Sequence, residues 1–97
     1  MPRSKLEINI DILKVLANKG PLILTHVTYA TSLNYNVVKE YLGFLVKQGL
    51  AEAQNVSKQR VVYLATEKGL KVLEYLRELR QVLPIVEEAQ DNTPSID

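Results

Sequence analysis

The chain has 97 residues, of which 46% are hydrophobic, enough for one small domain with a modest core. Cysteine is absent, which excludes disulfides and thiolate metal sites. The net charge of +1 hides a basic body and an acidic end: residues 1–71 carry ten Lys/Arg and five Asp/Glu, and residues 72–97 carry two and six. This distribution is compatible with a nucleic-acid partner for the body of the chain.

The sequence does not indicate a membrane protein or an enzyme. The first apolar run is interrupted by Glu7, Asn9, Asp11 and Lys14, and no stretch is long enough to cross a bilayer. We therefore expect a soluble, cytoplasmic protein without a membrane partner. We find no phosphate loop, nucleophile motif or metal cluster, and the single histidine, His26, has no ligand partner at a recognisable spacing. We expect no enzyme activity, no cofactor and no metal.

The first helix is predicted from Lys5 to Asn18, because Ser4 and Glu7 have the spacing of a capping box. Its apolar residues cover more than half of the helix circumference, wider than the stripe of a surface helix in a monomer. Either this helix is unusually buried, or it packs between its own core and a second subunit. We favour the second interpretation, with dimer contacts at Ile8, Ile12 and Val15.

A helix-turn-helix follows. Pro21 prevents helix continuation and Leu22–Leu24 is expected to be extended. Thr25 is expected to cap a short helix, His26–Thr31. After a break at Ser32 and Leu33, a longer helix is predicted over Asn34–Gln48, with Asn34 as its N-cap and Gly49 ending it.

The longer helix is amphipathic. The side predicted to face the core contains Tyr35, Val38, Leu42 and Leu45, and the opposite stripe contains Asn36, Glu40, Gly43 and Lys47. Tyr29 and Tyr41 are also expected to be structural. A polar helix face behind a tight turn is the geometry of a helix that reads DNA.

A β-hairpin and a last helix complete the chain. Strands are predicted over Leu50–Asn55 and Arg60–Ala65, joined by the polar residues 56–59. Thr66 is expected to cap a helix beginning at Glu67, and Pro84 to kink it or end it near Leu83. This helix carries an apolar heptad seam of Val72, Leu76, Leu79, Leu83 and Val86.

The predicted fold is mainly α-helical with a small β-hairpin: a winged helix-turn-helix ordered helix-helix-helix-strand-strand-helix. We expect a single domain over residues 1–90, with a long C-terminal dimerisation helix over about 67–90. Residues 91–97 are expected to form a disordered tail.

Three motifs resemble a known family. They are Tyr29-x-x-x-Leu33-Asn34-Tyr35, then Tyr41-Leu42-x-x-Leu45-Val46-x-x-Gly49-Leu50, and Tyr63-Leu64-Ala65-Thr66-Glu67-Lys68-Gly69. Their order and spacing resemble those of small archaeal winged-helix DNA-binding proteins, cellular or viral, that dimerise through a C-terminal helix. The chain is broadly similar to MarR/PadR-type transcription regulators.

This resemblance implies a homodimer that binds double-stranded DNA and regulates transcription, most simply as a repressor. The recognition helix would enter the major groove with Asn34, Asn36, Val37, Lys39, Glu40, Gly43 and Lys47. The wing would place Ser57, Lys58, Gln59 and Arg60 on the backbone or in the minor groove, and the preceding helix would offer Thr25, His26 and Thr28 to a phosphate. Architectural DNA binding, or a winged helix used only for protein–protein contact, remains an alternative. Asn34 could serve only as a cap, and the sequence does not specify an effector molecule.

Overall fold

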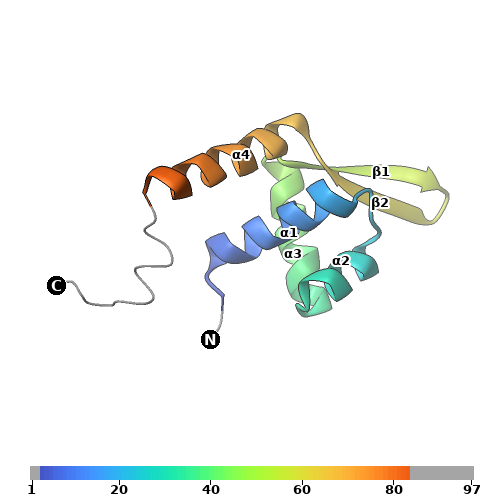
Figure 1. Ribbon diagram of the computed structural model, residues 1–97. Helices are drawn as coiled ribbons and strands as arrows, with labels where there is room; N and C mark the ends of the chain where they lie inside the picture. The colour runs from blue at the N-terminus through green and yellow to red at the C-terminus, as the bar shows by residue number, and fades with distance from the viewer. Residues whose placement is uncertain (1–2, 84–97) are drawn as a thin grey trace.

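Four helices and one antiparallel hairpin build the protein (Figure 1). In chain order they are α1 (Lys5–Lys19), α2 (Leu24–Thr31), α3 (Tyr35–Lys47), β1 (Ala51–Ser57), β2 (Arg60–Ala65) and α4 (Glu67–Val82). The computed structural model describes residues 3–83. Three helices, a hairpin and a last helix are the elements of the winged helix that the sequence predicts.

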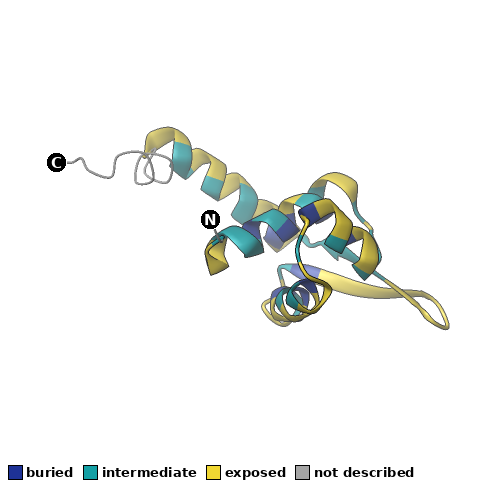
Figure 2. Cartoon of the chain, turned by 90° about the horizontal axis from the view of Figure 1, so that it is seen from below, coloured by how far each residue is buried: buried dark blue, intermediate teal, exposed yellow. Residues whose placement is uncertain are grey.

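The core lies where α1, α2 and α3 meet the start of the hairpin. Figure 2 shows the buried positions on the inward-facing sides of the helices, while most of the hairpin is exposed. Apolar side chains recur at helical spacing along α1 and α3, so each helix contributes one row. The buried cluster consists of Ile12, Leu16, Val27, Val38, Leu42, Leu45 and Ala51.

α1 is covered on two sides by its own chain. Ile12 and Leu16 belong to the core cluster, whereas Ile10 and Leu13 are buried on the side of α4. The wide apolar circumference therefore reflects a helix held between the core and α4. This corrects the expectation for Ile12, whose side chain is 0% exposed and has no surface left for a partner.

The capping box predicted at the start of α1 is confirmed. The Ser4 hydroxyl accepts a hydrogen bond from the Glu7 backbone N–H at 3.1 Å, and the Glu7 carboxylate accepts one from the Ser4 N–H at 2.8 Å. At the other end, Gly20 caps the helix by donating its N–H to the Leu16 carbonyl at 2.9 Å. These bonds satisfy backbone groups that a helix end otherwise leaves unpaired.

α2 begins two residues earlier than predicted. Ile23 is its N-cap, with no side-chain capping bond, and Thr25 lies inside the first turn. The reason is a contact distant in sequence: Leu22 exchanges two backbone hydrogen bonds with Tyr63 of β2, at 2.9 and 2.7 Å. This pairing fixes Leu22 as extended and lets the helix start at Leu24, so the expected cap at Thr25 is wrong.

The turn into α3 uses a left-handed residue and a polar cap. Ser32 has φ of 58°, and Asn34 accepts a hydrogen bond from the Asn36 N–H at 2.7 Å. α3 ends at Lys47, after which Gly49 has φ of 79°. Glycine is favoured there because a side chain makes this conformation costly. The predicted N-cap and the terminating glycine are both confirmed.

The wing is longer than the sequence suggests. β1 starts one residue after the predicted start and ends two residues after the predicted end, whereas β2 has the predicted bounds. The pairing runs from Ala51 opposite Ala65 to Ser57 opposite Arg60, with a bulge between Asn55 and Ser57. The extra residue keeps both strands paired up to a tight turn at Lys58 and Gln59, so the hairpin projects further from the body.

The residues directly after α3 are hydrogen-bonded to the start of α4. Thr66 caps α4 by accepting from the Gly69 N–H at 3.1 Å, and its hydroxyl donates to the Gly49 carbonyl at 2.6 Å. Lys68 Nζ donates to the Gln48 carbonyl at 2.9 Å, and the Thr66 N–H to the Leu50 carbonyl at 3.1 Å. We call this set of bonds the α3–α4 junction.

α4 ends at Val82, with Leu83 in an extended conformation as its C-cap. This agrees with the prediction that Pro84 ends the helix near Leu83, because proline disfavours a helical conformation in the residue before it. The possible continuation over residues 85–89, the seam residue Val86 and the expected tail over residues 91–97 lie outside the described residues.

Gly69→Ala should lower the free energy of unfolding by about 2 kcal/mol or more, because the added Cβ would lie 2.2 Å from the Leu50 carbonyl oxygen. The same change at Gly43 should raise it by about 0.5–1 kcal/mol, because that helical position is open and alanine is the better helix former. Urea unfolding followed by circular dichroism measures both. Equal stability of the two variants would contradict the tight junction.

Candidate nucleic-acid interface

The side of α3 opposite the core is open to solvent. Val38, Leu42 and Leu45 are buried, and each predicted residue of the polar stripe is exposed. Because residues three and four apart lie on one side of a helix, these side chains form a continuous surface. We call it the α3 face; it consists of Asn36, Lys39, Glu40, Gly43 and Lys47.

Two further predicted residues border this face. Val37 is half-buried, so only part of its side chain is available. Asn34 is exposed and uses its side-chain oxygen to accept from the Asn36 N–H. The capping role considered for Asn34 is therefore confirmed, at a position directly before the α3 face.

The wing tip forms a second exposed surface. The bulge and tight turn bring four polar side chains to the end of the hairpin, and all of them are exposed: Ser57, Lys58, Gln59 and Arg60. Among the described residues the ion pairs are Arg3–Asp11 and Lys71–Glu67, so neither wing cation is neutralised within that part of the chain. A cation free of such a pair is available to an anionic partner.

The start of α2 offers fewer groups than predicted. Thr25 and His26 are exposed in the first turn, where the His26 N–H already donates to the Ile23 carbonyl at 3.0 Å. Thr28 is half-buried and its hydroxyl donates to the Leu24 carbonyl at 3.0 Å. Its proton is thus used within α2.

Two tyrosines expected in the core are on the surface instead. Tyr29 is 76% exposed and Tyr35 is 48% exposed, while Tyr41 packs against the core as predicted. In α2 the buried row is Val27 and Thr31, and Tyr29 lies on the other side. Tyr35 is the first residue of α3, beyond the row that the core covers. The four-residue spacing of Val27 and Thr31 is the sequence signal that identifies Tyr29 as exposed.

Arg3 is held against the body and is not part of a free basic arm. Its guanidinium donates to the Asp11 carboxylate at 2.6 Å and to the Thr31 carbonyl at 2.7 Å. The second bond satisfies a carbonyl at the C-terminal end of α2, where a positive charge is favourable. Arg3 therefore fastens the segment before α1 to α2.

The charge of these exposed surfaces is modest. Residues 24–65 contain four Lys/Arg and two Asp/Glu, and the acidic Glu40 lies on the α3 face itself. Lys39 and Lys47 on α3 and the two wing cations give a positive potential spread over two elements. Binding of a polyanion would require both elements together.

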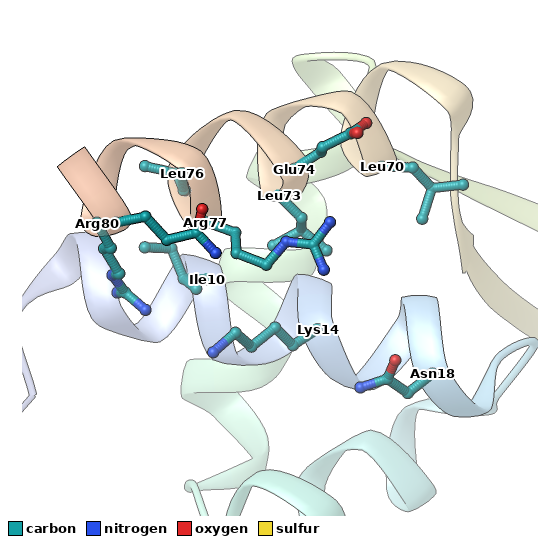
Figure 3. Close-up of a pocket in the computed structure, with 10 residues that line it drawn as sticks. Ile10, Lys14, Asn18, Leu70, Leu73, Glu74, Leu76, Arg77 and Arg80 are labelled. Carbon is teal, nitrogen blue, oxygen red and sulfur yellow. The ribbon is translucent and has the colours of Figure 1, made fainter.

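A groove separates α1 from α4. Its volume is about 800 Å³, and Figure 3 shows Lys14 of α1 and Arg77 and Arg80 of α4 among the side chains that line it. Apolar residues from both helices, Ile10, Leu73 and Leu76, also line the groove. It belongs to the helix pair and not to the α3 face or the wing.

The predicted dimer residues differ in exposure. Ile8, Val15, Val72, Leu76 and Leu79 are half-buried, and Leu83 is 47% exposed. Leu76 also lines the groove toward α1. The largest apolar surfaces near the seam belong to Tyr75, 65% exposed, and Val82, 74% exposed. An interface along α4 would therefore be centred on the flank that carries these two residues.

Within residues 3–83, no group of three or more His, Asp or Glu side chains could hold a metal ion. In the same part of the chain no helix is long and apolar enough to cross a membrane. The surfaces that remain to be explained are the α3 face, the wing tip and the apolar flank of α4.

The family comparison agrees with this geometry. A family model described as "Winged helix-turn-helix" matches residues 2–83. This chain belongs to that family. Its members are DNA-binding transcription regulators and not enzymes, so the predicted fold class and the expected lack of catalysis are both confirmed.

Solved structures show the same architecture. Sso10a-2, a DNA-binding protein from Sulfolobus solfataricus, is 31% identical; the match covers 92% of this chain and 90% of that chain, with a TM-score of 0.71. The PcaV transcriptional regulator from Streptomyces coelicolor, solved with its natural ligand, is 19% identical with a TM-score of 0.72. The match covers 91% of this chain but only 62% of PcaV. The latter similarity shows the fold alone.

A curated relative extends the comparison to a methanogen. The uncharacterised protein MJ0287 of Methanocaldococcus jannaschii is 28% identical over 81 residues, which is 84% of this chain and 77% of the relative. The resemblance inferred from the motifs, to archaeal winged-helix and MarR-type proteins, is thus confirmed.

Proposed function

We propose that this protein binds double-stranded DNA as a homodimer and regulates transcription, most simply by occupying a promoter. The observation that carries the proposal is the exposed α3 face, with its polar groups on one side of a helix that the core holds rigidly from behind. The likeness to Sso10a-2, described as a DNA-binding protein, supports the same choice of partner.

The chemistry of the α3 face suits the major groove, which is wide enough to admit a helix. Asn36 can form paired hydrogen bonds with adenine, Lys39 can bind guanine or phosphate, and Glu40 can accept from cytosine. Asn34 and Val37 border these residues, and Val37 can contact a thymine methyl group. Lys47, near the end of α3, is suited to a phosphate.

The wing and the start of α2 would supply contacts to the backbone. Lys58 and Arg60 can neutralise phosphates or reach the minor groove, with Ser57 and Gln59 adding neutral hydrogen bonds. Thr25 and His26 stand at the first turn of α2, where the positive end of the helix dipole favours an anion. These contacts position the protein, while the α3 face reads sequence.

Dimerisation would double this small interface. α4 carries Val72, Tyr75, Leu79 and Val82 at alternating spacings of three and four, the pattern that two helices bury between them. Tyr75 and Val82 are mostly exposed in one chain and gain the most from burial. Two copies related by a two-fold axis would present two α3 helices to successive major grooves.

A second candidate is architectural DNA binding without sequence preference. One observation favours it: the description of Sso10a-2 as a DNA-binding protein, with no regulatory role named. Contact with another protein alone is favoured by the modest charge of residues 24–65 and by Glu40 on the α3 face. The three functions differ in whether duplex DNA binds and whether one sequence is preferred.

Fluorescence anisotropy with a labelled duplex, at several salt concentrations, should show that log K falls linearly with log salt. Lys58→Ala should weaken binding to all sequences and reduce the slope by about one per protomer, because one phosphate contact is lost. Lys71→Ala is the matched control, since Lys71 pairs with Glu67 on α4 at 3.7 Å and lies outside the proposed interface. Absence of binding at about 50 mM salt would contradict DNA binding itself.

Val82→Asp should convert the dimer to a monomer, because an unpaired charge would be buried on the apolar flank of α4. Light scattering after gel filtration should give twice 11.0 kDa for the wild-type chain and 11.0 kDa for the variant. Gln81→Asp adds the same charge on the groove side of α4 and should leave the dimer intact. A wild-type monomer at micromolar concentration would contradict the proposed interface.

A further inference from the structure

Gly43 is the one glycine of the chain that the fold does not require. A Cβ at Gly20 would lie 2.5 Å from the Leu16 carbonyl oxygen, and one at Gly69 would lie 2.2 Å from that of Leu50. Gly49 has φ of 79°, where side chains are unfavourable. At Gly43 an added Cβ meets nothing within 4 Å, and the backbone is ordinary α-helix. Packing and backbone geometry therefore both permit a side chain at position 43.

A glycine inside a helix weakens it relative to alanine. Position 43 is well within α3, which runs from residue 35 to residue 47 and supports the α3 face. The chain thus has a weak helix former where any good helix former would fit. Such a residue indicates a requirement that arises outside the folded chain, and close approach of a ligand to the backbone is one such requirement for glycine.

The surroundings of Gly43 indicate the kind of ligand. Lys39 and Lys47 lie one turn before it and one turn after it, on the same exposed side, and Glu40 and Asn36 complete the surface. Lys39 and Lys47 are eight residues apart, which is about 12 Å along a helix axis. The missing side chain of Gly43 leaves a dip in the α3 face, with a lysine on either side. Such a dip suits a ligand that places an uncharged edge in it and anionic groups next to the two lysines.

We propose that Gly43 is the point of closest approach between α3 and bound DNA, where base edges in the major groove pack directly on the helix backbone. The proposal rests on the DNA-binding function proposed above and adds the depth at which α3 sits. A side chain at this position holds the helix away from the groove floor. The contacts of Asn36 and Lys39 with base edges then lengthen, because both residues project from the same face.

The dip also has a consequence for sequence preference. A thymine methyl group is the bulkiest feature on the floor of the major groove. Gly43 leaves room for such a group at the base pair it faces, and a larger residue removes that room. The size of residue 43 therefore decides whether a thymine is accepted at the base pair that α3 approaches most closely.

The test measures affinity and stability on the same variants of the full chain: Gly43→Ala, Gly43→Gln and the control Asn18→Gln, which enlarges an exposed polar side chain on α1. Duplex binding is measured by anisotropy and stability by urea unfolding. Gly43→Ala should unfold at a higher urea concentration than wild type and yet bind DNA more weakly. Gly43→Gln should raise the dissociation constant at least about tenfold, and Asn18→Gln should match wild type.

The opposite directions of the two measurements separate a binding role from a structural one, because a damaged fold lowers both. Wild-type affinity in Gly43→Gln would overturn the close-approach proposal while leaving DNA binding in place. Failure of the wild-type chain to bind any duplex at low salt would overturn the proposed function, and this inference with it.

Discussion

The α3–α4 junction is the constraint on which the rest of the structure depends. Carbonyl groups at the end of a helix and just after it need hydrogen-bond donors from elsewhere. Here the carbonyls of the residues that follow α3 accept hydrogen bonds from Thr66 and Lys68 at the start of α4. Thr66 provides two of these bonds and Lys68 the third, while Gly69 allows the backbones to approach closely. The segment that follows the helix that would read DNA is therefore bonded directly to the helix that would dimerise.

This connection matters because the proposed interface is weak in a single copy. The α3 face is nearly neutral, and the wing adds only two cations at its tip. A second copy doubles the contacts, but only if both α3 helices stand at a fixed distance and angle. Because α4 is bonded to the segment after α3, the packing of two α4 helices would set the distance and angle between the two α3 helices. A small, weakly charged domain would in this way gain affinity for DNA and a fixed spacing of its two contacts.

The sequence predicted those features that depend on neighbouring residues. The capping box at Ser4, the cap at Asn34 and the start of α4 after Thr66 are each set by side chains within three residues of the bond they make. The terminating role of Gly49 is equally local, since it follows from one backbone angle. Amphipathic spacing placed the polar stripe of α3 correctly for the same reason.

Features that depend on distant contacts were missed. The start of α2 is fixed by pairing of Leu22 with Tyr63, about forty residues away in the chain, and the length of the wing by a bulge. Ile12 was placed at an interface because helical periodicity does not show which part of the wide apolar surface of α1 the core of the same chain covers. Tyr29 was expected to be structural from helical periodicity, although the spacing of Val27 and Thr31 places it on the other side of α2.

The central claim is that the α3 face and the wing tip together form one DNA-binding surface. Amide chemical shifts of the full-length protein, followed by NMR while a duplex is added, test it most directly. We expect the largest shifts at Asn36, Gly43 and residues 57–60, and small ones at Lys14, Arg77 and Arg80 in the α1–α4 groove. Shifts concentrated in that groove, with the α3 face unchanged, would contradict it.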